Sequence, residues 1–170
     1  MTAANENLLP DPARPYLSTD RVRWADVDLV GIMRFSAFTR LVENAEQDMW
    51  RSAGLRYGEN MRQPDVWMPR RNLSIEYTLP ARIDDVLQLV TSVSRIGDSS
   101  LILKVDVMTD DFRQLYAAAT VVTVCVNAKT WTKELVPAEF RKALAPYTLS
   151  AEASRAWVRE HMVEQGQGVS

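Results

Sequence analysis

The scarce reactive side chains decide which chemistry this 170-residue sequence can perform. It contains one cysteine, Cys125, and one histidine, His161, which lies near the C-terminus. A zinc site, a disulfide framework or a multi-histidine centre needs several such residues in one chain, so the sequence predicts no metal site. A Ser-His-Asp or Cys-His mechanism would have to depend on His161. We therefore expect any general base that acts near neutral pH to be a carboxylate.

The charge balance disfavours two classes of partner. Lys and Arg number 20 against 22 Asp and Glu, which gives a formal net charge of -2 and no basic field to hold nucleic acid or an anionic membrane. The N-terminus lacks a basic segment followed by an apolar one, and no apolar run approaches the roughly 20 residues of a membrane span. We expect a cytoplasmic, reduced protein with no nucleic acid or membrane partner, in which Cys125 is a small core residue.

Three segments of different character follow one another along the chain. Residues 1–18 carry three prolines and no sustained periodicity, which predicts a flexible N-terminal arm. Residues 19–147 contain the strand and helix patterns of one domain. Residues 148–170 predict a short amphipathic helix that starts near Ser150, followed by a tail.

A strand, a loop and one long helix open the domain. Residues 21–24 alternate between apolar and charged, as in a half-buried strand, and residues 26–35 predict a loop that holds Gly31. Ser36 is a plausible N-cap, and Gly54 fits a left-handed C-cap. Between them, apolar residues recur every three or four positions on one face of a helix of about five turns: Phe38, Leu41, Val42, Ala45 and Met49.

The rest of the domain predicts antiparallel strands. Alternating apolar residues between about 67 and 127 indicate about four of them, and residues 116–126 are apolar on both faces, which predicts a central strand covered on both sides. One long helix against a curved antiparallel sheet of about five strands is an α+β fold.

Two segments carry a resemblance to a known family. The run Asp-Val-Asp-Leu-Val-Gly-Ile-Met-Arg-Phe-Ser-Ala-Phe at residues 26–38 resembles the opening of the hotdog-fold acyl-CoA thioesterases of the 4-hydroxybenzoyl-CoA thioesterase type. The run Ile-Glu-Tyr-Thr-Leu-Pro-Ala-Arg-Ile-Asp-Asp at residues 75–85 resembles a strand and turn of the same family. The resemblance covers about residues 18–144. It implies a hotdog fold, with the sheet wrapped around the helix, and subunits that pair edge to edge with active sites at their interface, as a homodimer or a dimer of dimers.

The resemblance also implies a reaction and two catalytic groups. An acid that matches Asp28 performs the hydrolysis, as nucleophile or as base on water, and the backbone N–H that matches Phe35 polarises the thioester carbonyl. The physical chemistry agrees, because a thioester is already activated and the first turn of a helix offers unpaired N–H groups with a partial positive charge. This mechanism needs no cofactor. We expect hydrolysis of an acyl thioester of coenzyme A or of an acyl-carrier protein.

Neighbouring residues complete the expected site. Gly31, Met33 and Arg34 of the loop are candidates for substrate contact; Arg34 could instead pair with Asp28 and lower its pKa. Glu43 on the helix is a reserve acid. Asp26 is expected to be solvated or structural.

A second set of residues is placed at the mouth of the cleft. Arg70 and Arg71, together with Arg62 and Arg82, are candidates to hold the phosphates of coenzyme A, since arginine suits phosphate. Trp67 and Met68 could line an acyl pocket, although such residues are more often core.

Three other functions stay open. The first is a non-catalytic hotdog protein that binds acyl-CoA or another small ligand. The second is a hotdog hydratase or dehydratase for enoyl-thioesters, which resembles family members with an Asp-His or Glu-His pair and would depend here on His161. The third is an α+β protein with a structural or interaction role.

Overall fold

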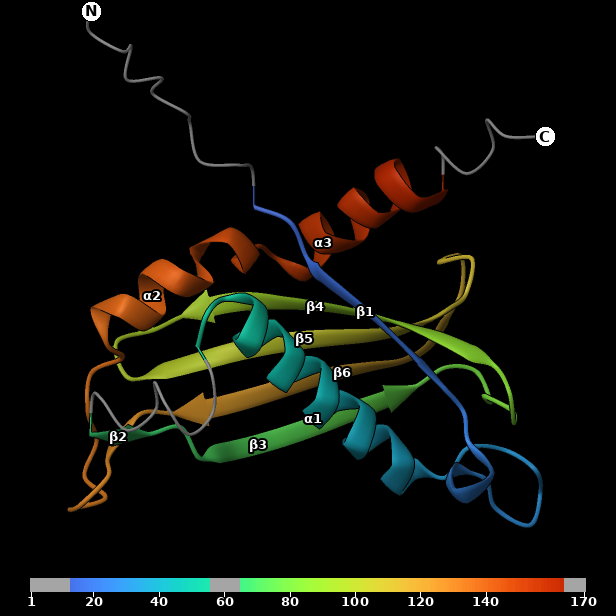
Figure 1. The fold of residues 1–170 in the computed structure, drawn as a ribbon, viewed down its shortest axis with the longest axis horizontal. Coiled ribbons are helices and arrows are strands. Elements are labelled where there is room, and N and C mark those ends of the chain that lie inside the picture. Colours follow the sequence, from blue (N-terminus) through green and yellow to red (C-terminus); the bar gives the residue numbers. More distant parts are fainter. Residues whose placement is uncertain (1–12, 56–64, 164–170) are drawn as a thin grey trace, which may run out of the picture.

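A five-stranded antiparallel sheet forms the body of the protein (Figure 1). The computed structural model describes residues 13–55 and 65–163. The strands lie in the order β1-β4-β5-β6-β3, and a short ribbon of β2 and β7 stands beside them. Their bounds are β1 Tyr16–Arg21, β2 Val66–Trp67, β3 Arg70–Tyr77, β4 Val86–Ile96, β5 Ser100–Thr109, β6 Leu115–Val124 and β7 Val126–Asn127.

Helix α1, Phe35–Ser52, lies across one face of this sheet (Figure 1). Gly54 has φ +78°, so the predicted left-handed end of the helix is confirmed. The prediction of Ser36 as N-cap was wrong, because the Ala37 N–H already donates to the Arg34 carbonyl at 2.9 Å and Arg34 is the N-cap. The helix buries its predicted apolar face together with Glu46 and Trp50, and the long helix against a curved antiparallel sheet is the predicted hotdog arrangement.

The core lies between α1 and the inner face of the sheet. Every second residue of the three middle strands points into it and is at most 2% exposed. These residues are Leu87, Leu89, Thr91 and Val93 of β4, Leu101, Leu103, Val105 and Val107 of β5, and Ala117, Ala119, Val121 and Thr123 of β6. Burial at this period explains why the alternating pattern predicted the strands.

Two helices follow the sheet. Helix α2, Ala138–Leu144, packs against the end of α1, where the rings of Trp50 and Phe140 meet edge-on at 5.7 Å. Helix α3, Ala151–Val158, lies on the outer face of the sheet and continues as a π-helical turn through Val163; Ser150 caps it by accepting from the Ala153 N–H at 3.1 Å. Val158 packs with Val90 and Phe112 on the outer face of the sheet. The short helix predicted from Ser150 is confirmed.

The first strand differs from its prediction. Strand β1 is Tyr16–Arg21, paired with β4 from Tyr16 opposite Thr91 to Arg21 opposite Val86, so ordered structure starts inside the expected arm 1–18. Residues 24–26 form a 3-10 turn in place of the expected strand end, because the Asp26 carboxylate accepts from the Arg23 N–H at 2.9 Å. Residues 1–12 of the arm and 164–170 of the tail lie outside the described residues.

Strand β3 is the edge of the sheet next to β6. As predicted, the strand from residue 116 is an interior one, but its outer-face residues, such as Val122, are only half-buried. All residues of β3 are exposed except the half-buried Ile75. In the described part of the chain the second edge of β3 pairs with no strand.

None of the helices within residues 13–55 and 65–163 combines the length and apolar character that crossing a membrane requires.

Candidate active site

The loop between β1 and α1 is a tight hairpin closed by backbone hydrogen bonds. Val27 and Met33 form an antiparallel bridge, and the Asp28 N–H donates to the Ile32 carbonyl at 2.9 Å. The Gly31 N–H donates back to the Asp28 carbonyl at 3.0 Å. Gly31 has φ +79°, the left-handed geometry that follows a tight turn in a hairpin of this length and that favours glycine.

The Asp28 side chain supports this turn with only one of its two oxygens. Oδ1 accepts from the Val30 N–H at 2.9 Å and from the Ile32 N–H at 3.4 Å, the usual contact of an aspartate that begins a turn. Oδ2 has no hydrogen-bond partner among the described residues. The half-buried carboxylate thus has one oxygen that is held by the turn and one without a hydrogen-bond partner in the described part of the chain.

Asp28 lines a cavity of about 570 Å³. Its walls are the loop, the first turn of α1 and the segment that leaves β3: Ile32, Met33, Arg34, Phe35, Ser36, Phe38, Tyr77, Thr78, Leu79, Pro80 and Ala81. The Met33 N–H donates to the Ala81 carbonyl at 2.8 Å and joins two of these walls. The predicted contacts Met33 and Arg34 therefore lie at the cavity with Asp28 and Phe35; Gly31 shapes the loop beside it.

The start of α1 offers hydrogen-bond donors to the same cavity. Among the described residues, the N–H groups of Phe35 and Ser36 have no acceptor, as expected for the first turn of a helix. The Phe35 side chain is 76% exposed, so the residue contributes mainly its backbone. Tyr77 closes the β3 side, with its hydroxyl donating to the Phe35 carbonyl at 3.4 Å and its ring edge-on to Phe38 at 5.2 Å.

Arg34 does not form the suggested ion pair with Asp28. Its guanidinium donates to the carbonyl oxygen of Ala25, and its N–H donates to the carbonyl of Asp26 at 2.8 Å. Arg34 therefore ties the end of the loop to its beginning, while its exposed side chain still borders the cavity.

Arg70 is held by a partner that the sequence did not suggest. Its Nη2 donates to Glu46 Oε2 at 2.8 Å, and the Trp50 indole donates to Glu46 Oε1 at 3.3 Å. Glu46 is 2% exposed although it belongs to the charged half of the helical pattern. The one available signal was Trp50, a helical turn further on, whose indole needs an acceptor when it is buried.

The other predicted residues that the structure describes do not line this cavity, although Arg82 forms an antiparallel bridge with Ile32 of its wall. Arg71 is exposed at the opposite end of β3 from Tyr77, and Glu43 is exposed on α1; neither lines the cavity. The Arg82 N–H donates to the Asp85 carboxylate at 2.8 Å. Trp67 belongs to β2 and is 45% exposed, and Met68 directly after it is buried. Arg62 lies outside the described residues.

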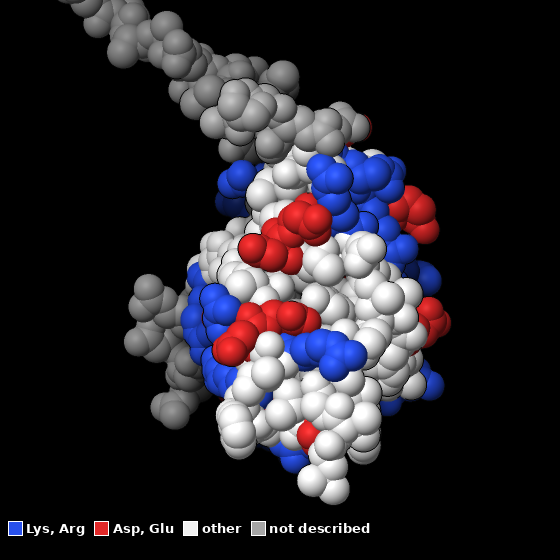
Figure 2. All heavy atoms as spheres, turned by 90° about the vertical axis from the view of Figure 1, so that its right-hand side faces the viewer, with Lys and Arg blue, Asp and Glu red and all other residues white. Residues whose placement is uncertain are grey.

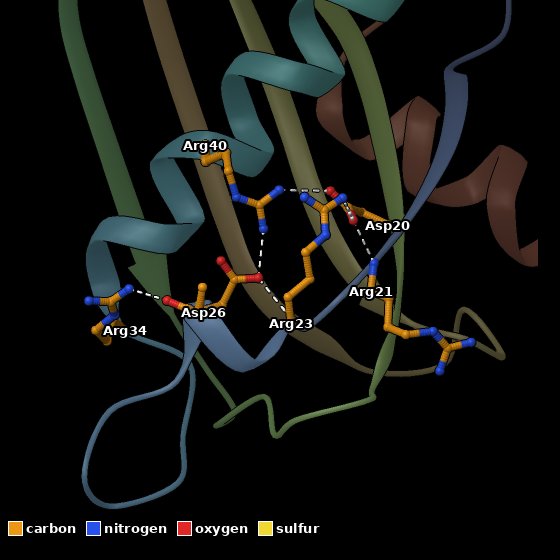
Figure 3. A network of polar contacts seen from close by, with 7 residues as sticks. Asp20, Arg21, Arg23, Asp26, Arg34 and Arg40 are labelled. Carbon is orange, nitrogen blue, oxygen red and sulfur yellow. Dashed lines mark hydrogen bonds and ion pairs between the residues drawn. The ribbon is translucent and has the colours of Figure 1, made fainter.

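A buried group of charges underlies the loop (Figure 3). Asp26, expected to be solvated or structural, is only 6% exposed and pairs with Arg40 at 2.7 Å. Arg40 also pairs with Asp20 at 3.0 Å. Burial opposes the charge of Asp20, but the hydrogen bonds from the Arg21 N–H and from Arg40 outweigh it and hold the pKa of Asp20 below its ordinary value.

His161 lies on the other side of the sheet. Its ring stacks on Trp157 at 4.4 Å, and Trp157 packs in the outer cluster around Val90 and Phe112. Within one chain the single histidine is therefore remote from Asp28, and nothing joins them into the acid–histidine pair on which the hydratase interpretation depends.

The similar proteins of known description are hydrolases of CoA thioesters. The chain is 25% identical over 126 residues to the acyl-CoA thioester hydrolase YbgC of Escherichia coli, an alignment that covers 72% of this chain and 92% of the relative. It is 25% identical over 129 residues to a 1,4-dihydroxy-2-naphthoyl-CoA hydrolase of Synechococcus, which covers 72% and 85%.

Solved structures agree on the fold. A 1,4-dihydroxy-2-naphthoyl-CoA thioesterase from Synechocystis superposes with a TM-score of 0.71 at 21% identity, over 77% of this chain and 96% of that one. A Staphylococcus aureus protein solved in complex with CoA superposes with a TM-score of 0.73 at 15% identity, over 80% and 85%. The family model of the thioesterase-like superfamily matches residues 22–144, which include the Asp28 loop, α1 and the whole cavity. The chain therefore belongs to the thioesterase-like superfamily.

Proposed function

We propose that this protein is an enzyme that hydrolyses acyl-CoA thioesters to a free acid and a thiol at the cavity beside Asp28. One observation carries the proposal. The Asp28 carboxylate, one oxygen of which has no partner among the described residues, lines the same cavity as the unpaired N–H groups of Phe35 and Ser36 at the start of α1. The names of the relatives, acyl-CoA and 1,4-dihydroxy-2-naphthoyl-CoA hydrolases, support this substrate class. An acyl-carrier-protein thioester has the same reacting bond and is a second possible substrate.

The two groups divide the work in a simple way. The thioester carbonyl oxygen binds at the Phe35 N–H, where the helix dipole and the hydrogen bond stabilise the negative charge that develops on it. In one route Asp28 takes a proton from water, the water oxygen bonds to the carbonyl carbon, the C–S bond breaks, and the departing thiolate takes the proton from Asp28 to leave as the thiol. In the other, Asp28 Oδ2 itself attacks the carbon, and water hydrolyses the resulting anhydride. Both routes release the same acid and thiol.

The proposed active form is a homodimer joined along the free edges of β3. The backbone groups of such an edge can pair with another strand, and two large apolar side chains are exposed along it. Leu73 is 39% exposed and Tyr77 51%, while Leu29 and Val30 at the loop tip are exposed too. Figure 2 shows the loop end of the molecule, whose lower surface is mostly uncharged.

Antiparallel pairing of two β3 strands would also give Arg71 a function. In that arrangement the Arg71 end of one β3 lies beside the Tyr77 end of the other, which borders the cavity. Arg71 of the partner subunit would then be placed to bind the phosphates of coenzyme A, a role that it cannot fill within its own subunit. Arg70 is committed to Glu46 and would support the strand at this point.

The proposed location is the cytoplasm, where coenzyme A thioesters are made and used. Cys125 is a buried free thiol, and burial raises its pKa, so it stays protonated and unreactive.

A substrate panel tests the proposed function. The purified protein is assayed with aryl-, short- and long-chain acyl-CoA thioesters and a reagent that reports free thiol. We expect turnover of at least one class, with a one-to-one yield of acid and thiol. Tight binding of thioesters by calorimetry without any turnover would contradict the proposal and favour a non-catalytic binding protein.

A further inference from the structure

The loop that carries Asp28 is anchored at its base by a charge pair outside the cavity (Figure 3). Arg40, in the second turn of α1, donates through Nη2 to Asp26 Oδ2 at 2.7 Å and through Nη1 to Asp20 Oδ2 at 3.0 Å. Asp26 precedes the loop directly, and Asp20 lies in β1. One guanidinium therefore fixes α1, β1 and the start of the loop relative to each other.

Burial makes this pair stronger than an ordinary surface contact. The Asp26 side chain is 8% exposed and the Arg40 side chain 31%. Asp26 Oδ2 also accepts from the Arg23 N–H at 2.9 Å, so the carboxylate is fixed from two sides. Removal of the guanidinium would leave a buried carboxylate without its cation, which is strongly unfavourable.

The same aspartate holds both ends of the loop. Its carbonyl oxygen accepts from the Arg34 N–H at 2.8 Å, next to the Ala25 carbonyl that accepts from the Arg34 guanidinium. Asp28 lies two residues after Asp26, and Phe35 follows Arg34 directly. The ion pair that attaches Asp26 to Arg40 of α1 thus helps to determine where the Asp28 carboxylate lies relative to the Phe35 N–H.

We propose that the Asp26–Arg40 pair positions the Asp28 carboxylate against the Phe35 N–H and so sets kcat without contact with the substrate. The inference rests on the thioesterase function proposed above. A displacement of about 1 Å between reacting groups can lower a rate about a hundredfold, so loss of the anchor should appear in the chemical step.

Replacement of the guanidinium tests this role. In Arg40→Met we expect kcat to fall about tenfold to a hundredfold while KM changes by less than about threefold, because the substrate surface is intact. Arg40→Lys should recover part of kcat, since one ammonium cannot bridge two carboxylates as the planar guanidinium does. The matched control is Arg51→Met on the same helix, which breaks the exposed Arg51–Asp48 pair at 2.7 Å and should keep the wild-type kcat.

Amide hydrogen exchange separates positioning from general stability. In Arg40→Met the N–H groups of Gly31 and Arg34 should exchange faster, while those of β4 and β5 keep their wild-type rates. If Arg40→Met does not fold, Asp26→Asn, which keeps the shape and removes the charge, is expected to show the same fall in kcat and the same local exchange.

Two results would overturn the inference. One is a wild-type kcat in a folded Arg40→Met or Asp26→Asn variant. The other is an increase in exchange spread evenly over the sheet and the loop. A wild-type protein without any thioester turnover would instead overturn the proposed function, so the two failures are distinguishable.

Discussion

The Met33 N–H donates to the carbonyl oxygen of Ala81 at 2.8 Å, and this bond connects the loop that carries Asp28 to the segment that leaves the edge strand β3. The loop and this segment are two walls of the same cavity. A hydrogen bond therefore links the segment after the edge strand to the loop of the candidate active site.

The Phe35 N–H can be removed without removal of the helix. Phe35 is the first residue of α1, where proline is well tolerated, and Arg34 before it already has the extended geometry that proline requires, with φ -65° and ψ 144°. We expect Phe35→Pro to lower kcat by about a hundredfold to a thousandfold, the usual loss when one oxyanion donor is removed.

Phe35→Ala is the control for this change. It keeps the N–H and removes a side chain that is 76% exposed, so kcat should stay within about threefold of wild type. Circular dichroism checks that both variants keep their helix. Equal rates in the proline and alanine variants would show that this N–H is not the oxyanion donor.

A charge on the edge strand should separate the subunits. Leu73 lies in β3 and is 39% exposed in the single chain, so Leu73→Glu would place two carboxylates in the proposed interface. If the wild type forms the proposed dimer, we expect this variant to be a monomer by light scattering and to lose turnover, because the proposed contact of Arg71 of the partner subunit with the substrate would be lost. A variant that stays dimeric and fully active would show that β3 does not form the interface.

The sequence predicted the parts of this fold that follow from periodic burial. The alternating residues of β4, β5 and β6 face one core, and the three-and-four spacing from Phe38 to Met49 faces the same core from α1. Gly54 was predicted as the end of the helix because a left-handed C-cap favours glycine. Each of these signals is local, so the sequence alone carries it.

The contacts that the sequence did not predict join residues that are far apart along the chain. Nothing near Glu46 in the sequence shows that Arg70 neutralises it, and Arg40 resembles any other charged residue of an exposed helical face until the fold brings Asp20 and Asp26 to it. Arg34 was placed at the correct loop, but its direction depends on the Ala25 carbonyl. Long-range pairing of polar groups leaves no periodic trace in a single sequence.

Because of Tyr116, we expect the free energy of unfolding to fall as the pH rises above 10. Burial, together with the hydrogen bond to Asp85 at 3.0 Å and its charge, raises the pKa of Tyr116 to about 12 from an ordinary value of 10.0. Because the folded state favours the neutral phenol, the stabilisation is complete below pH 10 and is lost as the pH rises towards 12.

The variant Tyr116→Phe isolates this effect. It should be less stable than wild type by about 1 kcal/mol at pH 8, from loss of the hydrogen bond, and the difference should narrow between pH 10 and 12. Urea unfolding at several pH values measures it. A difference that stays constant up to pH 12 would contradict the assigned role of Asp85.

The catalytic role of Asp28 must be separated from its role in the turn, and the chain offers a matched control. Asp111 supports another turn in the same way, with Oδ1 accepting from the Arg113 N–H two residues on, at 3.1 Å. In Asp28→Asn and in Asp111→Asn the amide oxygen can still accept these bonds, so each turn is kept and only the carboxylate charge is lost.

The most direct measurement is therefore kcat of Asp28→Asn on the best acyl-CoA substrate, with Asp111→Asn beside it. The account predicts a loss of at least about a hundredfold for Asp28→Asn and a wild-type rate for Asp111→Asn. An unchanged rate in Asp28→Asn would contradict the central claim and make Glu43 the next acid to test.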